Sequence, residues 1–300
     1  MRAARALLAL GTALLLAACG GPDEANADLV FVSTRDGDYA IYAVSATGGG
    51  EHRLTDAHGD PATPSGLFFQ TEPTWSPDGN TIAFASKRSG TFQLYAMSSD
   101  GSGTRRLTST KEEDGQPTWS PDGDRIAFAR GAPSRIFVMN ADGSSARRVT
   151  DEEAEESDPA WSPDGRSIAY VRREPGSSIR EVWLVGPDGS QRRRLTKLNG
   201  VAQAPAWSPD ARQIAFSANT TSNRFDIYTI GLDGKDARLM TSGDDSFEPA
   251  WSPDGKTIAF SAGGAIVLLD VANGEEKTLT DSDNNDSSPA WAPATNGENN

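Results

Sequence analysis

The sequence predicts an all-β protein, a six-bladed β-propeller with four antiparallel strands in each blade. A segment that reads Pro-x-Trp-Ser-Pro-Asp-Gly, complete or degraded, occurs six times in the 300 residues. Its tryptophans follow one another at intervals of 44, 42, 46, 44 and 40 residues, at Trp75, Trp119, Trp161, Trp207, Trp251 and Trp291. No unit shows the 3.6-residue periodicity of a helical repeat. Four strands in a unit of about 40 to 45 residues are typical of a propeller.

Each unit contains the same four strand-like runs. In the first complete unit, Trp75 ends the first strand, and Ile-Ala-Phe, Leu-Tyr-Ala-Met and Arg-Leu-Thr at 82–84, 94–97 and 106–108 mark the other three. In the Ser-Pro-Asp-Gly turn that follows Trp75, proline sets φ to about −65° and glycine accepts a left-handed backbone. An Asp-Gly pair at 100–101 predicts the hairpin between the last two strands. The unit is therefore an antiparallel meander that must stack against its neighbours to bury its faces.

The two ends of the repeat region predict how the ring closes. The region opens at 29–33 without a first strand and ends with Ser288-Pro289-Ala290-Trp291, a first strand without partners. We expect this C-terminal strand to pair with the N-terminal blade, which leaves no open sheet edge at the seam. The propeller then spans residues 28–293, and residues 294–300 form a flexible tail.

The N-terminal residues are typical of an export signal. Arg2 and Arg5 precede an apolar run from 6 to 18, which is short of the roughly 20 residues that a membrane-spanning helix needs. Leu16-Ala17-Ala18-Cys19 resembles the lipobox of bacterial lipoproteins, a family in which this cysteine is acylated and the peptide before it is removed. Residues 1–18 are then a signal peptide and residues 19–27 a lipidated tether. The alternative is an ordinary secretory signal with a chance cysteine.

Composition excludes several functions. With one cysteine and two histidines, the chain can build neither a disulfide framework nor a histidine-rich metal centre. The net charge of −14 repels phosphate backbones, so we expect no nucleic-acid partner. The sequence has no Gly-x-Ser-x-Gly nucleophile motif, and acylation of Cys19 would leave no thiol. We expect a monomer that is not an enzyme and requires no cofactor.

The repeated motifs resemble the WD-like propeller repeats of the TolB family, over about residues 28–293. The resemblance implies the propeller fold, but similar repeats serve as periplasmic scaffold, peptidase gate and lyase body. The lyases use a histidine cluster around a metal and the peptidases add a hydrolase domain, and this chain offers neither. In TolB an α/β domain precedes the propeller, whereas this chain is expected to carry a lipid anchor. A role with the Tol-Pal system is therefore left open.

Acidic residues recur three positions before alternate tryptophans, where we expect the innermost strands to start near the mouth of the channel. The six residues at this position are Glu72, Gln116, Asp158, Ala204, Glu248 and Ser288. Glu72, Asp158 and Glu248 would form a three-fold set of oxygen ligands for Ca²⁺ or for the ammonium group of a ligand. Cations have been seen in the channels of TolB-like propellers, and the resemblance to that family makes this relevant to the three carboxylates. The alternative is that the three carboxylates are simply solvated strand starts.

The first connection between units is about nine residues longer than the others and contains Leu67, Phe68 and Phe69. It is either a partner-contact loop or a flap folded on its own blade. We expect a lipid-anchored scaffold of the cell envelope that binds a protein or peptide on this face. It would lie on the periplasmic face of an outer membrane or, in a cell without one, on the outer face of the plasma membrane. The alternative is binding of a solute or polysaccharide at the channel mouth, and a hydrolase or lyase is less favoured.

Overall fold

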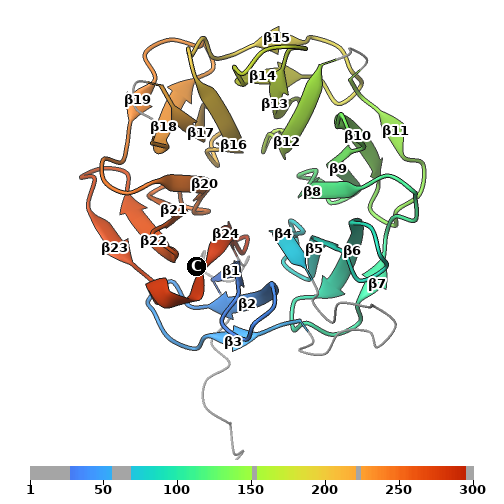
Figure 1. Ribbon diagram of the computed structural model, residues 1–300, viewed down its shortest axis with the longest axis vertical. Helices are drawn as coiled ribbons and strands as arrows, with labels where there is room; N and C mark the ends of the chain where they lie inside the picture. The colour runs from blue at the N-terminus through green and yellow to red at the C-terminus, as the bar shows by residue number, and fades with distance from the viewer. Residues whose placement is uncertain (1–27, 56–68, 151–153, 221–223, 295–300) are drawn as a thin grey trace, which may run out of the picture.

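A computed structural model describes residues 28–55, 69–150, 154–220 and 224–294, which form six four-stranded antiparallel sheets around a central channel (Figure 1). From the innermost strand to the outermost, blade 1 is β24 (Ser287–Trp291), β1 (Leu29–Ser33), β2 (Ala40–Val44) and β3 (His52–Arg53); blade 2 is β4 (Gln70–Trp75), β5 (Thr81–Ser86), β6 (Gln93–Ser98) and β7 (Arg105–Arg106). In the same order, blade 3 is β8 (Asp114–Trp119), β9 (Arg125–Arg130), β10 (Arg135–Asn140) and β11 (Arg147–Arg148); blade 4 is β12 (Glu155–Trp161), β13 (Ile168–Arg173), β14 (Glu181–Val185) and β15 (Arg193–Arg194). Blade 5 is β16 (Val201–Trp207), β17 (Gln213–Asn219), β18 (Asp226–Gly231) and β19 (Arg238–Leu239); blade 6 is β20 (Ser246–Trp251), β21 (Thr257–Ala262), β22 (Ala265–Asp270) and β23 (Glu276–Thr278). A short 3₁₀ turn, η1 (Ser282–Asn284), precedes β24. The predicted fold is confirmed.

The predicted ring closure is confirmed as well. β24 pairs antiparallel with β1, with Leu29 opposite Trp291 and Val30 opposite Ala290, so the first blade combines both ends of the propeller. Figure 1 shows the two strands side by side although they lie at opposite ends of the repeat region. The N–H and the hydroxyl of Thr34 both donate to the carbonyl of Asn284, at 3.1 and 3.0 Å.

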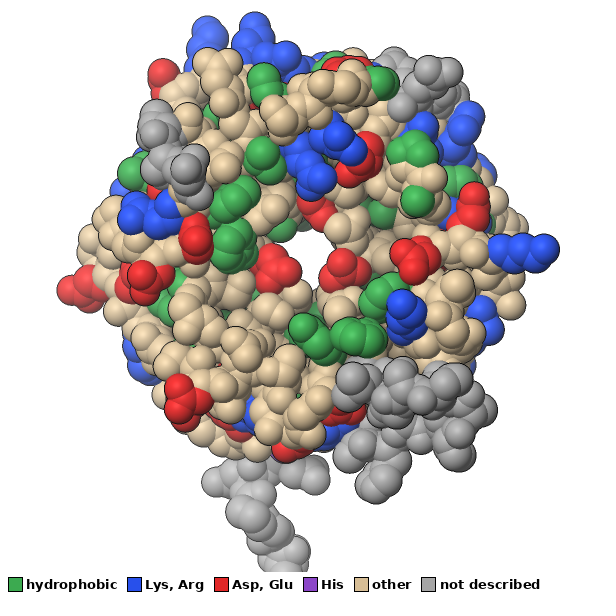
Figure 2. Space-filling view, in the orientation of Figure 1, with side chains coloured by type: hydrophobic (Ala, Val, Ile, Leu, Met, Phe, Trp, Pro, Cys, Tyr) green, Lys and Arg blue, Asp and Glu red, His purple; other side chains and the backbone are tan. Residues whose placement is uncertain are grey.

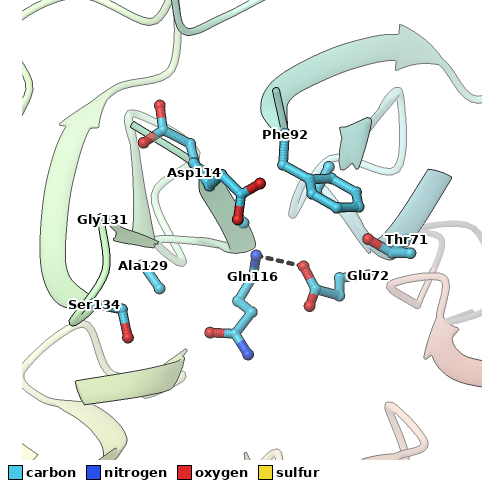
Figure 3. Close-up of a pocket in the computed structure, with 11 residues that line it drawn as sticks. Thr71, Glu72, Phe92, Asp114, Gln116, Ala129, Gly131 and Ser134 are labelled. Atoms are coloured by element: carbon cyan, nitrogen blue, oxygen red, sulfur yellow. Dashed lines mark hydrogen bonds between the residues drawn. The ribbon is translucent and has the colours of Figure 1, made fainter. Parts of the chain in front are cut away.

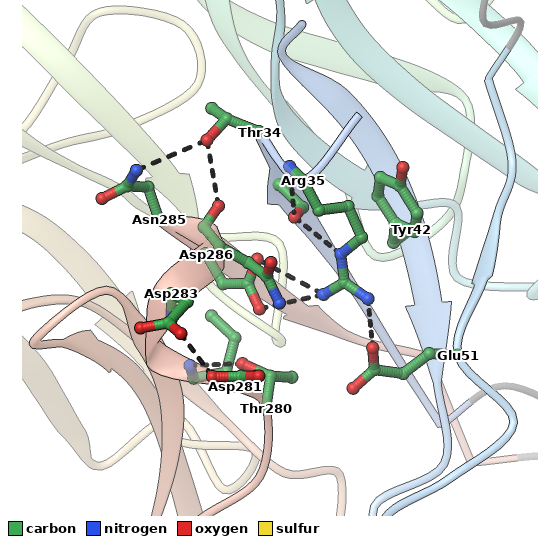
Figure 4. A network of polar contacts seen from close by, with 12 residues as sticks. Thr34, Arg35, Tyr42, Glu51, Thr280, Asp281, Asp283, Asn285 and Asp286 are labelled. Carbon is green, nitrogen blue, oxygen red and sulfur yellow. Dashed lines mark hydrogen bonds and ion pairs between the residues drawn. The ribbon is translucent and has the colours of Figure 1, made fainter. Parts of the chain in front are cut away.

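An arginine reinforces this closing seam. Arg35 donates to Asp286, whose carboxylate is fully buried, and also forms an ion pair with Glu51 (Figure 4). Its guanidinium lies 4.6 Å from the centre of the Tyr42 ring. Burial is the largest influence on Asp286 and raises the pKa of this carboxyl, while the Arg35 charge acts in the opposite direction. The seam is thus held by the backbone hydrogen bonds between β24 and β1, by the ion pairs of Arg35 and by its contact with the Tyr42 ring.

The hydrophobic core lies between the blades, because each sheet buries both of its faces. Between blades 1 and 2, for example, Val30 and Ile41 pack against Ile82 and Phe84. Six clusters of this kind fill the seams around the ring. Within the described residues, no helix is long and apolar enough to cross a membrane.

The Ser-Pro-Asp-Gly turns take the geometry that their residues favour. In the first, the N–H of Gly79 donates to the carbonyl of Ser76 at 2.9 Å, and φ of Gly79 is 71°. The hydroxyl of Ser76 donates to Asp78, which is the largest of several hydrogen bonds that lower the pKa of that carboxyl. The turn with Ala211 in place of glycine keeps the same hydrogen bonds, with the alanine at φ 58°.

The threonine of each Arg-Leu-Thr segment completes the backbone hydrogen bonding of its blade. Five of the six outermost strands have only two residues, so they stop short of the second residue of the neighbouring strand. The N–H of that residue donates to the threonine hydroxyl instead; Val182 to Thr196, at 2.9 Å, is one example. The same bond occurs in all six blades, with Thr55, Thr108, Thr150, Thr196, Thr241 and Thr280 as acceptors.

The arginines of the outermost strands also link neighbouring blades. Arg147 donates to the carbonyl of Pro187 at 2.7 Å, and Arg193 to that of Leu232 at 2.9 Å. Charge on an exposed edge protects a sheet from aggregation, and the structure adds this contact between blades.

Truncation after Asn285 tests the closure, because it removes β24 and exposes one edge of β1. We expect a loss of at least about 5 kcal/mol from lost burial and ladder hydrogen bonds, and a fall in Tm of about 10 °C or more. The measurement is thermal unfolding by circular dichroism. A chain that ends at Ala294 keeps β24 and serves as the control. Equal Tm values for the two truncations would contradict the closed ring.

Candidate functional site

Corresponding residues of the six innermost strands line the central channel in layers. The part of the channel that these residues line has a volume of about 400 Å³. Its first layer holds Glu72, Gln116, Asp158, Ala204, Glu248 and Ser288, and its second holds the prolines that follow each of them. Small residues, such as Thr74 and Ala160, and then tryptophans, such as Trp207 and Trp291, continue the wall toward the other end. The sequence-predicted carboxylates are therefore brought around one channel.

All six residues of the first layer have a left-handed backbone, with φ between 48° and 57°, although none is glycine. The pairing between the first and second strands shifts register at this point in every blade, which makes it a β-bulge. The following proline cannot donate to the ladder, which explains where the bulge falls. The first-layer residues thus lie inside the innermost strands; the expectation that they start the strands is corrected.

In blades 1, 3, 4, 5 and 6 this backbone turns the N–H of the first-layer residue toward the preceding blade, where a side chain accepts it. Glu72 accepts from the N–H of Gln116 at 2.6 Å, and Gln116 from that of Asp158 at 2.8 Å. Asp158 accepts from Ala204 at 3.3 Å. Glu248 accepts the N–H of Ser288 at 2.7 Å. A left-handed non-glycine residue costs about 1–3 kcal/mol, and these contacts hold it in place.

In blade 5 a side chain from another strand takes over the acceptor role. Ala204 has no acceptor side chain, and the N–H of Glu248 in the next blade bonds the hydroxyl of Ser217 instead, at 3.0 Å. Ser217 comes from β17, the second strand of blade 5. Because a serine on another strand replaces the missing side chain, the first-layer polar residues have a structural role in joining blades.

Burial and mutual repulsion act on the carboxylates of the channel. Burial is the largest influence on Glu72 and raises its pKa to about 7; the N–H of Gln116 opposes this, and the charges of Asp158 and Glu248 add to it. Burial likewise raises the pKa of Asp158, against the hydrogen bond from Ala204. Glu72 therefore changes charge near neutral pH.

The predicted calcium site stays a prediction. Glu72, Asp158 and Glu248 surround the channel on alternate blades, and each already accepts a hydrogen bond from the next blade. Across residues 28–55, 69–150, 154–220 and 224–294, no three His, Cys, Asp or Glu side chains form a group that could hold a metal ion. His52 lies exposed on the outermost strand β3, away from the channel.

Aromatic residues gather on the face of the propeller at which the outermost strand of one blade connects to the innermost strand of the next. We call this face the channel face. Tyr39 and Phe69 have ring centres 5.1 Å apart, and Phe92 follows at 6.4 Å from Phe69. A second pair, Phe225 and Phe247, has its ring centres 5.1 Å apart. Figure 2 shows acidic side chains around the channel opening and hydrophobic side chains beside it. Of the three residues predicted for partner contact, Phe69 belongs to the first cluster, and Leu67 and Phe68 lie outside the described residues.

Sequence reasoning missed Tyr39, Phe92 and Phe225. Each immediately precedes the third strand of its blade, and its carbonyl accepts an N–H from the innermost strand of the next; Phe92 accepts from Asp114 at 3.0 Å. The recurrence of an aromatic residue before the third strand in units 1, 2 and 5 is the signal that could have revealed them.

Glu72→Gln tests the electrostatics of the channel. Between pH 4.5 and 7 the unfolded chain releases a proton that folded Glu72 retains, so wild-type stability falls as pH rises through this window. Glutamine keeps an acceptor for Gln116 but carries no charge. We expect the variant to match the wild type near pH 4.5 and to be more stable by about 2–3 kcal/mol at pH 8. Denaturant unfolding across this pH range measures the difference, with exposed Glu276→Gln as control; parallel curves for Glu72→Gln and wild type would contradict the assignment.

Comparisons with known proteins agree with the fold. TolB from Acinetobacter baumannii is similar in structure, with a TM-score of 0.76 and 20% identity, over 92% of this chain and 69% of that chain. Oligogalacturonate lyase in complex with manganese gives a TM-score of 0.58 at 15% identity, over 83% and 73% of the two chains. Identities this low show the fold alone.

A short stretch is also similar to a curated protein, the uncharacterized peptidase YuxL of Bacillus subtilis (strain 168). The identity is 56% over 39 residues, which are 13% of this chain and only 6% of that protein. The family model described as TolB beta propeller domain matches residues 21–157 and 131–297, nearly the whole chain. This chain therefore belongs to the family of TolB β-propeller domains.

Proposed function

We propose that this chain is a non-catalytic binding platform of the bacterial cell envelope, anchored by lipid at Cys19, that takes a protein or peptide on its channel face. The observation that carries the proposal is the pair of aromatic clusters beside an acidic channel opening. Clustered aromatic residues next to polar groups are typical of protein interaction sites. Membership of the TolB β-propeller family favours a scaffold over an enzyme.

The aromatic clusters support contact with a partner in particular. Tyr39 is 42% exposed, a high value for a large aromatic residue, and packs directly on Phe69. Phe225 and Phe247 come from neighbouring blades and meet across a seam. Two such clusters can bind two apolar side chains of one extended or folded partner, while the carboxylates between them select against acidic segments.

Photo-crosslinking in intact cells tests the choice of face. The photoreactive amino acid p-benzoylphenylalanine replaces Phe69 or Phe225 on the channel face. In matched controls it replaces Arg212 or Lys256, whose side chains are 83% and 80% exposed on the turns at the opposite end of the innermost strands. We expect protein adducts from the first two positions only. Adducts of equal yield from both ends contradict the proposal, and no protein adduct at any position favours the solute or polysaccharide alternative.

Cys19→Ser tests the anchor and its compartment. We expect wild-type protein from cells fed labelled palmitate to carry the label and to sediment with membranes. The variant should lose the label, because serine offers no thiol to acylate. Wild-type protein that is unlabelled and released would identify an ordinary secretory signal, and Ser242→Ala, at an exposed position between two strands, controls for expression.

A further inference from the structure

A second pocket opens beside the channel, at the seam between blades 2 and 3. Its volume is about 190 Å³, room for several water molecules at about 30 Å³ each. Figure 3 shows Phe92, Thr71 and Glu72 on one side of it and Ala129 and Ser134 on the other. Glu72 borders both this pocket and the channel.

One residue, Gly115, keeps the pocket open toward Glu72. The corresponding position of the other innermost strands, four residues before the tryptophan, carries Thr71, Ser157, Gln203, Phe247 or Ser287. A Cβ atom at Gly115 would lie 3.2 Å from Oε2 of Glu72, closer than an ordinary contact. The missing side chain therefore leaves both the space and the approach to the Glu72 carboxylate open.

The charges around the pocket leave Glu72 and Glu113 as its acidic groups. Asp114 also lines the pocket, but Arg130 neutralises it with two hydrogen bonds of 2.6 and 2.9 Å. Arg130 in turn stacks on Phe128, 4.9 Å from the ring centre. Glu72 uses Oε2 for the N–H of Gln116, and a second carboxylate, that of exposed Glu113, lies at the rim.

The remaining surface suits the stem of a long cationic side chain. Phe92 and Ala85 on blade 2 and Ala129 on blade 3 are apolar, and the hydroxyls of Thr71 and Ser134 can accept hydrogen bonds. The Phe92 ring already attracts one ammonium, since Nζ of Lys87 lies 5.7 Å from its centre. Lysine and arginine combine an alkyl stem with a cationic head in this way.

We propose that this pocket binds a lysine or arginine side chain of the partner, with the stem along Phe92 and the cation at Glu72. The inference rests on the proposed function, because it names the residue type that the partner presents to this face. The pocket also sets the orientation in which a partner binds to the channel face, because only the seam between blades 2 and 3 has a glycine at this position.

Model compounds test the pocket without the partner. The full chain is titrated by NMR with Nα-acetyl-lysine methylamide, with the arginine equivalent, and with the neutral Nε-acetylated lysine compound. We expect saturable binding of the two cations and at least about tenfold weaker binding of the neutral compound. The ratio of the two cation affinities distinguishes lysine from arginine. Absence of binding by wild type, or equal binding of the neutral compound, overturns the proposal.

Two variants and a matched control locate the binding. Gly115→Ala should weaken cation binding at least about tenfold, because the methyl group fills the pocket against Glu72. Gly243→Ala, at a glycine with nothing within 4 Å of its added Cβ, should bind as wild type. Glu72→Gln should weaken binding similarly and keeps the test open if Gly115→Ala does not fold. Wild-type affinity in either Gly115→Ala or Glu72→Gln overturns the site, whereas the crosslinking experiment judges the binding platform independently.

Discussion

The channel and both faces of the ring depend on the antiparallel pairing of β24 with β1. A four-stranded blade is too small to bury its own faces, so each blade is stable only between two neighbours. The closing pair supplies the innermost strand of blade 1 and places Ser288, Pro289 and Trp291 in the same channel layers as their counterparts. Thr34 and Arg35 add polar contacts across the same seam. Without this pairing, blade 1 would lose its innermost strand, the strand that lines the channel.

Inside the ring, one structural device also creates the chemistry of the candidate site. The proline at the bulge cannot donate to the ladder, and the residue before it takes a left-handed backbone whose N–H faces the previous blade. In blades 1, 3, 4, 5 and 6 a polar side chain of the previous blade accepts that N–H, so polar groups are placed in the channel wall for structural reasons. Where the accepting group is a carboxylate, as in Glu72, its oxygens also give the channel negative charge. The Glu72 carboxylate thus has two roles, as acceptor of the Gln116 N–H and as an acidic group of the channel and of the pocket beside it.

The differences between blades carry the information on binding. The aromatic clusters use Tyr39, Phe92 and Phe225, which stand before third strands in only three of the units. Glycine stands at this position in only one of the six innermost strands, Gly115, at the seam where the pocket opens. A near-symmetric frame therefore presents an asymmetric face, with aromatic clusters and the pocket at defined seams. Such asymmetry allows one partner to bind in one orientation.

The sequence by itself determined the number of blades, the order of strands, the closing strand and the position of Glu72, Asp158 and Glu248 around one channel. These follow from the repeat period, the turn residues and the alternation within each unit, which are local properties of the chain. Only the tertiary structure decided that Ser217 replaces the side chain missing at Ala204, that Phe69 meets Tyr39, and that Gly115 opens a pocket. Each of these is a contact between residues of different strands or blades, set by how two sheets pack at a seam. A missing side chain has no local signature, since whether it leaves a pocket depends on what the neighbouring blade places there.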